Sequence, residues 1–254
     1  MRLKDKVAIV TGGGSGFGAG ICAKFAAEGA RVLVADINLK AAQAVAAELG
    51  PHAQALRVDV AASADVKMMI EAARTQFGCL DILVNNAGMG HLPQALEGLP
   101  EDEFDRLCAV NMKSIYLAMR EAVPLFKAQA PSGGGMRGVV LNMASTAGVS
   151  PRPRLAWYNA SKGWVITATR ASAVELAPFG IRVNALNPVA GDTPMLKTFM
   201  GEDSPETRAR FLASIQLGRF STPADLGNAA CFLCSDEASM ITGVCMEVDG
   251  GRCI

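Results

Sequence analysis

Short runs of Val, Ile, Leu and Ala alternate with longer segments of helical periodicity along most of the chain. Runs of the first kind predict strands at 6–10, 31–36, 53–60, 80–88, 138–145, 181–188 and 244–251. Segments of the second kind predict helices at 16–28, 39–49, 63–76, 100–130, 158–176 and 223–234. This alternation is typical of βαβ units. It predicts an α/β fold, a doubly wound seven-stranded parallel sheet with helices on both faces.

Local signals mark some of the helix ends. Thr222, Pro223 and Asp225 supply a capping hydroxyl, a proline at the first helical position and an acid at the third. Pro178 and Gly180 follow the helix that ends near Ala177. The Gly-rich stretch 130–138 leads directly into the next strand, so we interpret it as a loop and residues 1–254 as one domain.

Composition narrows the class of partner. The chain has 254 residues, 50% of them hydrophobic, and a formal net charge of zero. Without a basic patch or a long block of like charges, nucleic acid and anionic membranes are poor partners, and a small molecule fits better. The apolar run before the first glycines is too short for a signal peptide, and no run is long enough to span a membrane. We expect a cytoplasmic protein.

The 7 cysteines are odd in number, scattered and set among apolar residues. This usage is typical of reduced thiols that pack as small hydrophobes, so we expect no disulfides. Cys231 and Cys234 have CxxC spacing, but no second pair or nearby His completes a metal site. We interpret both as buried packing residues and expect no metal.

A glycine-rich turn, TGGGSGFG from Thr11 to Gly18, lies between the first strand and the first helix. Bare backbone lets a phosphate approach, and the helix end supplies free N–H groups and a positive dipole. Asp36 ends the second strand 18 residues after Gly18, near the ~20 expected for an acid that binds an adenosine ribose. A merely tight βα turn and a turn acid are the alternatives.

Five motifs together resemble the short-chain dehydrogenase/reductase family. They are TGGGSGFG, the NNAG of 85–88, Ser145, the YNASK of 158–162 and the Asn-Pro of 187–188, in the family's order and spacing. The resemblance covers essentially the whole chain. It implies a Rossmann-type fold and hydride transfer between a nicotinamide cofactor and an alcohol or ketone.

Tyr158 and Lys162 are four residues apart, hence on one face of a helix. A phenol with a pKa of ~10 needs help to act as a base. The Lys162 ammonium, with the positive nicotinamide, would favour the phenolate. Ser145 leaves the fifth strand at its carboxyl end, where such sheets bind ligands. By resemblance, Ser145 orients the substrate oxygen, Lys162 also binds the nicotinamide ribose, and Asn111 kinks a helix and holds a water linking Lys162 to solvent. A surface Tyr–Lys pair and a turn hydroxyl are the plainer readings.

The resemblance also implies a set of cofactor-binding residues. Asn85 is as well explained by bracing the central strand as by cofactor contact. The family usually has Pro-Gly where this chain has Pro188-Val189, which puts the loop near the nicotinamide in question, although Gly191 could absorb the bend. The set is Gly12, Ser15, Gly16, Phe17, Gly18, Asp36, Ile37, Asp59, Val60, Asn85, Ala87, Gly88, Tyr158, Lys162, Pro188, Val189 and Thr193.

NAD is the expected cofactor. Members that use NADP commonly carry a basic residue where this chain has Ser15 and Ile37. Asp36 would accept hydrogen bonds from ribose hydroxyls and repel a 2′-phosphate.

Residues 191–218 resemble the family's substrate lid, with plain surface packing as the alternative. Candidate substrate residues are His91, Ala147, Leu155, Met195 and Phe199. Most are apolar, so we expect a secondary alcohol or ketone with an apolar ring or chain. Arg152 or Arg154 could hold an acid at its far end, although two arginines between prolines in a surface loop are more often simply solvated. A 3-oxoacyl-carrier-protein reductase and a non-catalytic dinucleotide sensor are the alternative functions.

The helix at 158–176 has small and apolar residues on more than one face, and the end of the chain, 244–254, is also apolar. Family members often pair two such helices across a dyad. We therefore expect a homotetramer.

Overall fold

The computed structural model describes residues 1–132 and 134–254, and in these residues seven parallel strands form one sheet. Their order is β3-β2-β1-β4-β5-β6-β7. The chain thus winds outward from β1 in both directions, and the carboxyl ends of β1 and β4 border the crevice where such sheets bind ligands. The strands are β1 (Val7–Thr11), β2 (Arg31–Asp36), β3 (Ala53–Arg57), β4 (Ile82–Asn85), β5 (Gly138–Met143), β6 (Ile181–Pro188) and β7 (Cys245–Val248).

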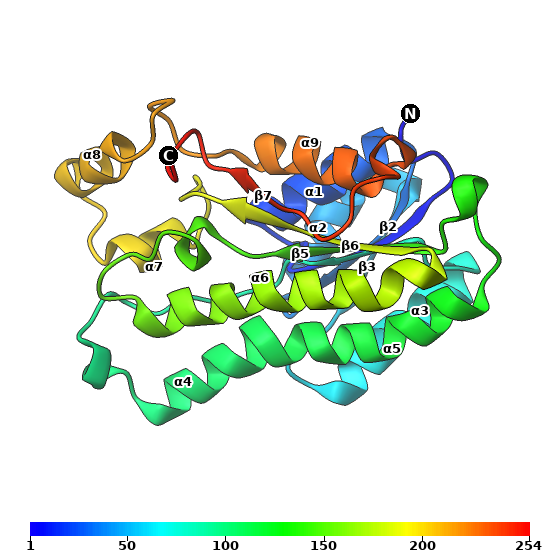
Figure 1. The fold of residues 1–254 in the computed structure, drawn as a ribbon, viewed down its shortest axis with the longest axis horizontal. Coiled ribbons are helices and arrows are strands. Elements are labelled where there is room, and N and C mark those ends of the chain that lie inside the picture. The colour runs from blue at the N-terminus through cyan, green and yellow to red at the C-terminus, as the bar shows by residue number, and fades with distance from the viewer.

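Helices cover both faces of this sheet (Figure 1). One face packs against α1 (Gly16–Ala27), α2 (Leu39–Leu49) and α9 (Pro223–Cys234). The other packs against α3 (Ser63–Phe77), α5 (Ser114–Ala128) and α6 (Ala156–Leu176). The predicted doubly wound, single-domain α/β fold is confirmed.

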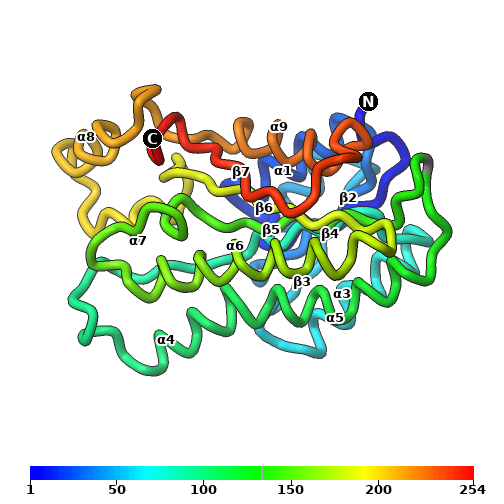
Figure 2. Tube along the Cα trace, viewed as in Figure 1, coloured from blue at the N-terminus to red at the C-terminus, as the bar shows by residue number. Residues whose placement is uncertain are grey.

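Three shorter helices lie beside or beyond the sheet. α4 (Glu101–Cys108) leads into α5, while α7 (Leu196–Met200) and α8 (Pro205–Ala213) lie past the carboxyl ends of the strands. The C-terminus ends near the same edge, as the tube in Figure 2 shows. Loop segments and short helices therefore surround the mouth of the crevice.

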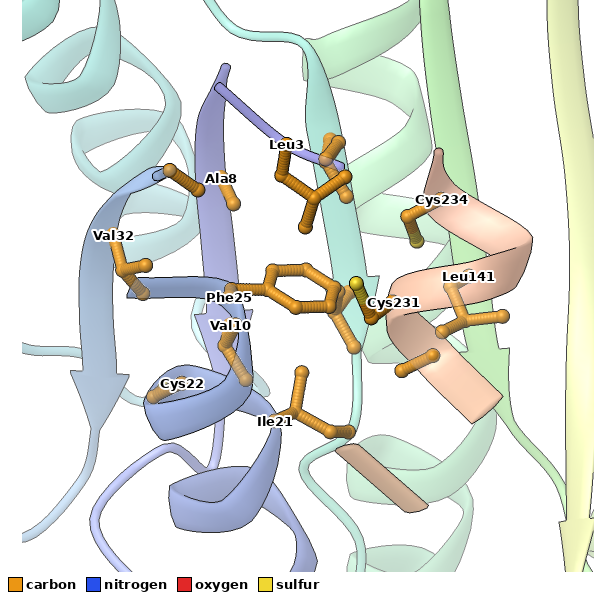
Figure 3. Packing of buried hydrophobic residues seen from close by; sticks show 14 of the residues in the cluster. Leu3, Ala8, Val10, Ile21, Cys22, Phe25, Val32, Leu141, Cys231 and Cys234 are labelled. Carbon is orange, nitrogen blue, oxygen red and sulfur yellow. The ribbon is translucent and has the colours of Figure 1, made fainter. Parts of the chain in front are cut away.

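The core on the α1 and α9 face is built from aliphatic, aromatic and thiol side chains. Figure 3 shows Phe25 of α1 beside Leu3 and Cys231, with Cys22 and Cys234 in the same buried cluster. The thiols therefore pack as small hydrophobes, as the sequence predicts. All 7 cysteines are free.

Several predicted boundaries need correction. The helix expected at 100–130 is interrupted by a π-helical segment, Ala109–Lys113, and ends at Ala128. The strand expected at 80–88 ends at Asn85, because the Thr11 hydroxyl accepts the N–H groups of Asn86 and Ala87 and turns the chain away. At α9 the prediction is confirmed, since Thr222 and Asp225 form a capping box with Pro223 in the first turn.

No helix among the described residues combines the length and the apolar character that a membrane crossing requires.

Candidate active site

One cavity of about 560 Å³ opens at the carboxyl ends of the strands. It extends from Asp36 and Asp59, beyond β2 and β3, to Ser145 and Tyr158, beyond β5 and at the start of α6. Most of the predicted residues line it: Gly12, Ser15, Gly16, Phe17, Gly18, Asp36, Ile37, Asp59, Val60, Ala87, Gly88, Ser145, Ala147, Leu155, Tyr158, Lys162, Pro188, Val189, Thr193, Met195 and Phe199.

The glycine-rich turn needs its glycines for two different reasons. Gly12 and Gly16 have φ of 63° and 52°, in the left-handed region that favours glycine. A Cβ on Gly18 would lie 2.0 Å from the Gly12 carbonyl oxygen. The turn thus packs tightly on the start of α1. Ser15, the N-cap of α1, makes no side-chain capping bond, so the helix N-terminus faces the cavity with free donors.

The turn is braced by Asn86, a residue outside the set predicted from the sequence. Asn86 Nδ2 donates to the carbonyl oxygens of Thr11 (2.8 Å) and Gly12 (3.1 Å). Asn86 also lines the cavity. The second Asn of the NNAG motif is the signal that could have identified it.

Asp36 lies at the opposite end of the cavity from Tyr158. Its Oδ2 accepts the N–H of Gly14 and its Oδ1 accepts the N–H of Asn38, both at 2.9 Å. Each carboxylate oxygen keeps a second lone pair, and none of the ion pairs among the described residues involves Asp36. The carboxylate is therefore held in place by two backbone N–H groups, has no cationic partner among the described residues and can still accept hydrogen bonds from hydroxyl groups.

Tyr158 is buried on the first turn of α6, at the wall of the cavity. Burial raises its pKa to about 12, while the Ser145 hydroxyl and the charge of Arg152 act in the opposite direction. Ser145 is held by its own turn, because its Oγ accepts the Ala147 N–H at 3.0 Å. Both hydroxyls converge on one region of the cavity, as the motifs predict.

Lys162 follows one helical turn later and is also buried. Its Nζ donates to the Met143 carbonyl oxygen at 2.8 Å and lies 5.8 Å from the centre of the Tyr158 ring. Burial lowers its pKa to about 8. Burial is the largest influence on the pKa of both groups. That Lys162, with the positive nicotinamide, favours the phenolate stays a prediction.

Three predicted residues lie away from the cavity surface. Asn85 points to the other side of β4 from Asn86, and its Nδ2 donates to Asn142 Oδ1 at 2.9 Å, so it braces the sheet. His91 is buried, with Nδ1 2.9 Å from the Leu92 carbonyl oxygen. Asn111 lies behind the site, where its side chain bonds both backbone polar groups of Met89 and the Ser161 hydroxyl.

The π segment has a local explanation in Asn111. Asn111 lies within this segment and its side chain bonds the Met89 backbone, and π-bulges are frequent at functional sites. Asn111 also stands close to Lys162, since a Cβ on Gly88 would lie 3.4 Å from Asn111 Oδ1 and 3.5 Å from Lys162 Nζ. The position where the sequence predicts a kink thus carries a π-helical segment.

The replacement of glycine by Val189 requires no strained backbone. Among the described residues, neither Val189 nor Gly191 has a positive φ, so Gly191 absorbs no bend of that kind. Position 191 requires glycine because a Cβ there would lie 2.1 Å from Phe17 Cζ. The chain continues past β6 with the Val189 N–H donated to the Val248 carbonyl oxygen at 3.3 Å.

The wall facing Tyr158 is mostly apolar. The Phe199 ring lies 4.8 Å from the Tyr158 ring, tilted by 51°, and Leu155, Met195 and Phe211 complete this wall. Phe211, on α8, was not singled out from the sequence. Of the two arginines considered, Arg152 lines the cavity, whereas Arg154 is exposed with Nη2 3.5 Å from the Pro93 carbonyl oxygen.

Known proteins are similar to this chain over nearly its whole length. Residues 12–252 match the family described as enoyl-(acyl carrier protein) reductase. The chain is 48% identical to 4-formylbenzenesulfonate dehydrogenase of Comamonas testosteroni, over 99% of each chain. It is 35% identical to galactitol 2-dehydrogenase of Agrobacterium fabrum, again over 99% of each.

A solved structure is also similar to this chain, in both fold and sequence. The crystal structure of 3-ketoacyl-(acyl-carrier-protein) reductase from Brucella melitensis, complexed with NADH, has a TM-score of 0.91 and 50% identity, covering 99% of this chain and 100% of that one. Fold, motif order and relatives lead to one conclusion. The chain belongs to the short-chain dehydrogenase/reductase family, as an oxidoreductase that acts on CH–OH groups.

Proposed function

We propose that this protein transfers a hydride between NAD(H) and a small secondary alcohol or ketone, with Tyr158 as the general base and acid. The observation that carries the proposal is a single cavity with the Asp36 carboxylate at one end and Tyr158, Ser145 and Lys162 at the other. A bound dinucleotide would reach from one end to the other, with its adenosine ribose at Asp36 and its nicotinamide near Tyr158.

The residues present fit a dinucleotide. The bare turn at Gly12 and Gly16 and the open N-terminus of α1 suit a pyrophosphate, and the acceptor Asp36 suits the hydroxyls of an adenosine ribose. Asp36 disfavours the extra phosphate of NADP, and neither Ser15 nor Ile37 compensates with a cation. A relative at 50% identity was solved with NADH. Bound NAD supplies the hydride acceptor.

The protein's own groups move the proton. In the oxidation direction, the Tyr158 phenolate takes the hydroxyl proton of the alcohol, and in reduction the phenol returns it to the carbonyl oxygen. The Ser145 hydroxyl, fixed by Ala147, orients the substrate oxygen. Lys162 supplies a buried positive charge beside the phenol, which opposes the raising of the Tyr158 pKa by burial.

The pocket favours an apolar ring or chain next to the reacting carbon. Leu155, Met195 and Phe199 offer no hydrogen bonds, and a polyol here would leave hydroxyl groups unpaired. We assign residues 191–218, which include α7 and α8, as the substrate lid, because they carry Met195 and Phe199 onto this wall.

A second candidate is a 3-oxoacyl-carrier-protein reductase, favoured by the name of the relative solved with NADH. Kinetics with NAD and a panel of cyclic secondary alcohols, 3-hydroxyacyl esters and aldoses separates these possibilities. We expect the cyclic alcohols to have the highest kcat/KM. Best activity on the esters would favour the second candidate, and best activity on aldoses would refute the apolar pocket. Failure to oxidise any of them would refute the proposed reaction.

We also propose a homotetramer. Trp157, Trp164 and Val174 are exposed along α6, and Met240 and Ile254 are exposed near the chain end. Such patches mark association surfaces. Light scattering at micromolar concentration should give four times the monomer mass of 26.5 kDa, and a monomer would refute the proposal.

A further inference from the structure

Arg152 is a cation on the cavity wall without a carboxylate partner. It lies in the loop before α6, and its Nη2 is buried without a hydrogen-bond partner among the described residues. None of the ion pairs between described residues includes it. A buried guanidinium donor left unpaired is costly, which indicates that something outside the chain satisfies it.

The position of Arg152 is fixed relative to Tyr158. Asn159, the residue after Tyr158, donates its Nδ2 to the Arg152 carbonyl oxygen at 2.7 Å, and its Oδ1 accepts the Arg152 N–H at 3.5 Å. The guanidinium carbon lies 4.5 Å from the centre of the Phe211 ring. The side chain is therefore held between α6 and α8, on the wall that faces the reacting end of the cavity.

A second arginine, Arg252, adds positive charge near Arg152 and so favours binding of an anion there. The charge of Arg252, near the chain end, contributes to lowering the pKa of Arg152 to about 10, although burial is the larger cause. Arg252 donates to the Ser150 hydroxyl at 3.0 Å and to its carbonyl oxygen at 3.3 Å, and no ion pair between described residues includes it. Two neighbouring guanidinium groups attract a negative group.

We propose that Arg152 binds a carboxylate or sulfonate group on the substrate, at the end remote from the carbon that reacts beside Tyr158. A guanidinium binds the oxygens of either group in a bidentate way. Apolar Leu155, Phe199 and Phe211 line the wall between these ends, so the spacer is an apolar or aromatic ring. The inference rests on the proposed function and narrows its substrate class to acid-bearing secondary alcohols.

The test compares four alcohols that differ only at one ring position. They are 1-phenylethanol and its 4-carboxylate, 4-sulfonate and neutral 4-carboxamide derivatives. We expect the wild-type protein with NAD to prefer the carboxylate or the sulfonate over the carboxamide at least tenfold in kcat/KM. Which of the two is preferred identifies the anion.

Arg152→Met should lower the ratio of kcat/KM for the preferred anion to that for the carboxamide roughly 10- to 150-fold, the range of a hydrogen bond to a charged group. The ratio cancels any effect of the Arg152 charge on the pKa of Tyr158, because that effect acts on both substrates. Arg152→Lys, which keeps the charge but not the planar fork, should recover part of the loss. If Arg152→Met does not fold, Arg152→Lys alone must still reduce the preference. Arg154→Met, on an exposed arginine of the same loop, is the matched control and should change nothing.

A binding measurement separates the two proposals. We expect 4-acetylbenzoate or 4-acetylbenzenesulfonate to bind the NADH-loaded protein at least tenfold more tightly than 4-acetylbenzamide by calorimetry, and Arg152→Met to abolish the difference. Equal turnover of charged and neutral alcohols, with equal binding, would overturn the anion site and leave the reaction intact. If no alcohol is oxidised, the reaction is wrong and the calorimetry alone decides the role of Arg152.

Discussion

Replacing Asp36 with Asn is the most direct test of cofactor choice. The two side chains have nearly the same shape, so the change mainly removes a charge. In the structure the Asp36 carboxylate accepts backbone N–H groups from Gly14 and Asn38 at 2.9 Å, and an Asn carbonyl oxygen can replace only one of these acceptors. The variant therefore loses one local hydrogen bond, worth about 1 kcal/mol of folding free energy, while the fold is kept.

The expected kinetic effects have opposite signs for the two cofactors. A hydrogen bond from a ribose hydroxyl to a carboxylate contributes about 1.5–3 kcal/mol, so part of that loss should reduce kcat/KM with NAD by about tenfold. For NADP, removal of a unit charge ~5 Å from the 2′-phosphate relieves roughly 3 kcal/mol at an effective dielectric constant of ~20. Activity with NADP should rise by about 100-fold.

The assay measures kcat/KM for each cofactor by absorbance of the reduced nicotinamide at saturating alcohol. Adding Ile37→Arg should raise NADP activity further, since Ile37 is 58% exposed and a longer cation fits there. Asp59→Asn removes the other carboxylate at this end of the cavity and is the matched control. If Asp36→Asn changes the NAD to NADP ratio by less than about threefold, Asp36 does not set cofactor choice.

The other predictions concern the reacting groups and the fold. Tyr158→Phe should abolish turnover while NAD still binds with nearly unchanged Kd by calorimetry, because only the proton acceptor is removed; substantial residual activity would mean that another base acts. Lys162→Met should weaken both turnover and NAD binding, and unchanged Kd would contradict the ribose assignment. Burial lowers the Lys162 pKa from 10.5 to about 8, so the folded state binds fewer protons than the unfolded state between these values and stability rises with pH across that window. The wild type should gain about 3 kcal/mol of unfolding free energy relative to Lys162→Met from pH 8 to 10.5 in urea titrations, and parallel pH curves would refute the burial argument. Thr222→Ala should destabilise the protein by about 1 kcal/mol through loss of the capping box, and an unchanged urea midpoint would show that the box contributes nothing.

Local pattern was enough to predict the sheet and its helices. β-branched runs bounded by glycine, proline or polar residues mark strands whatever their surroundings, and Thr222 with Pro223 marks a helix start through bonds within four residues. Boundaries that depend on distant contacts were harder. The strand at β4 stops at Asn85 because Thr11, far away in sequence, captures the next two N–H groups.

The sequence by itself determined which chemistry the protein carries. It sets the spacing of Tyr158 and Lys162 on one helix, the glycines of the first turn and the acid at the end of the second strand. Only the tertiary structure decided which of two similar residues, close together in the sequence, reaches the site. Asn86 and not Asn85 reaches the glycine turn, since adjacent strand residues point to opposite sides. Arg152 and not Arg154 lines the cavity, because Asn159 and Phe211, from two separate helices, hold it there. It also decided protonation, because burial by distant segments sets the pKa values of Tyr158 and Lys162, and sequence spacing carries no information about burial.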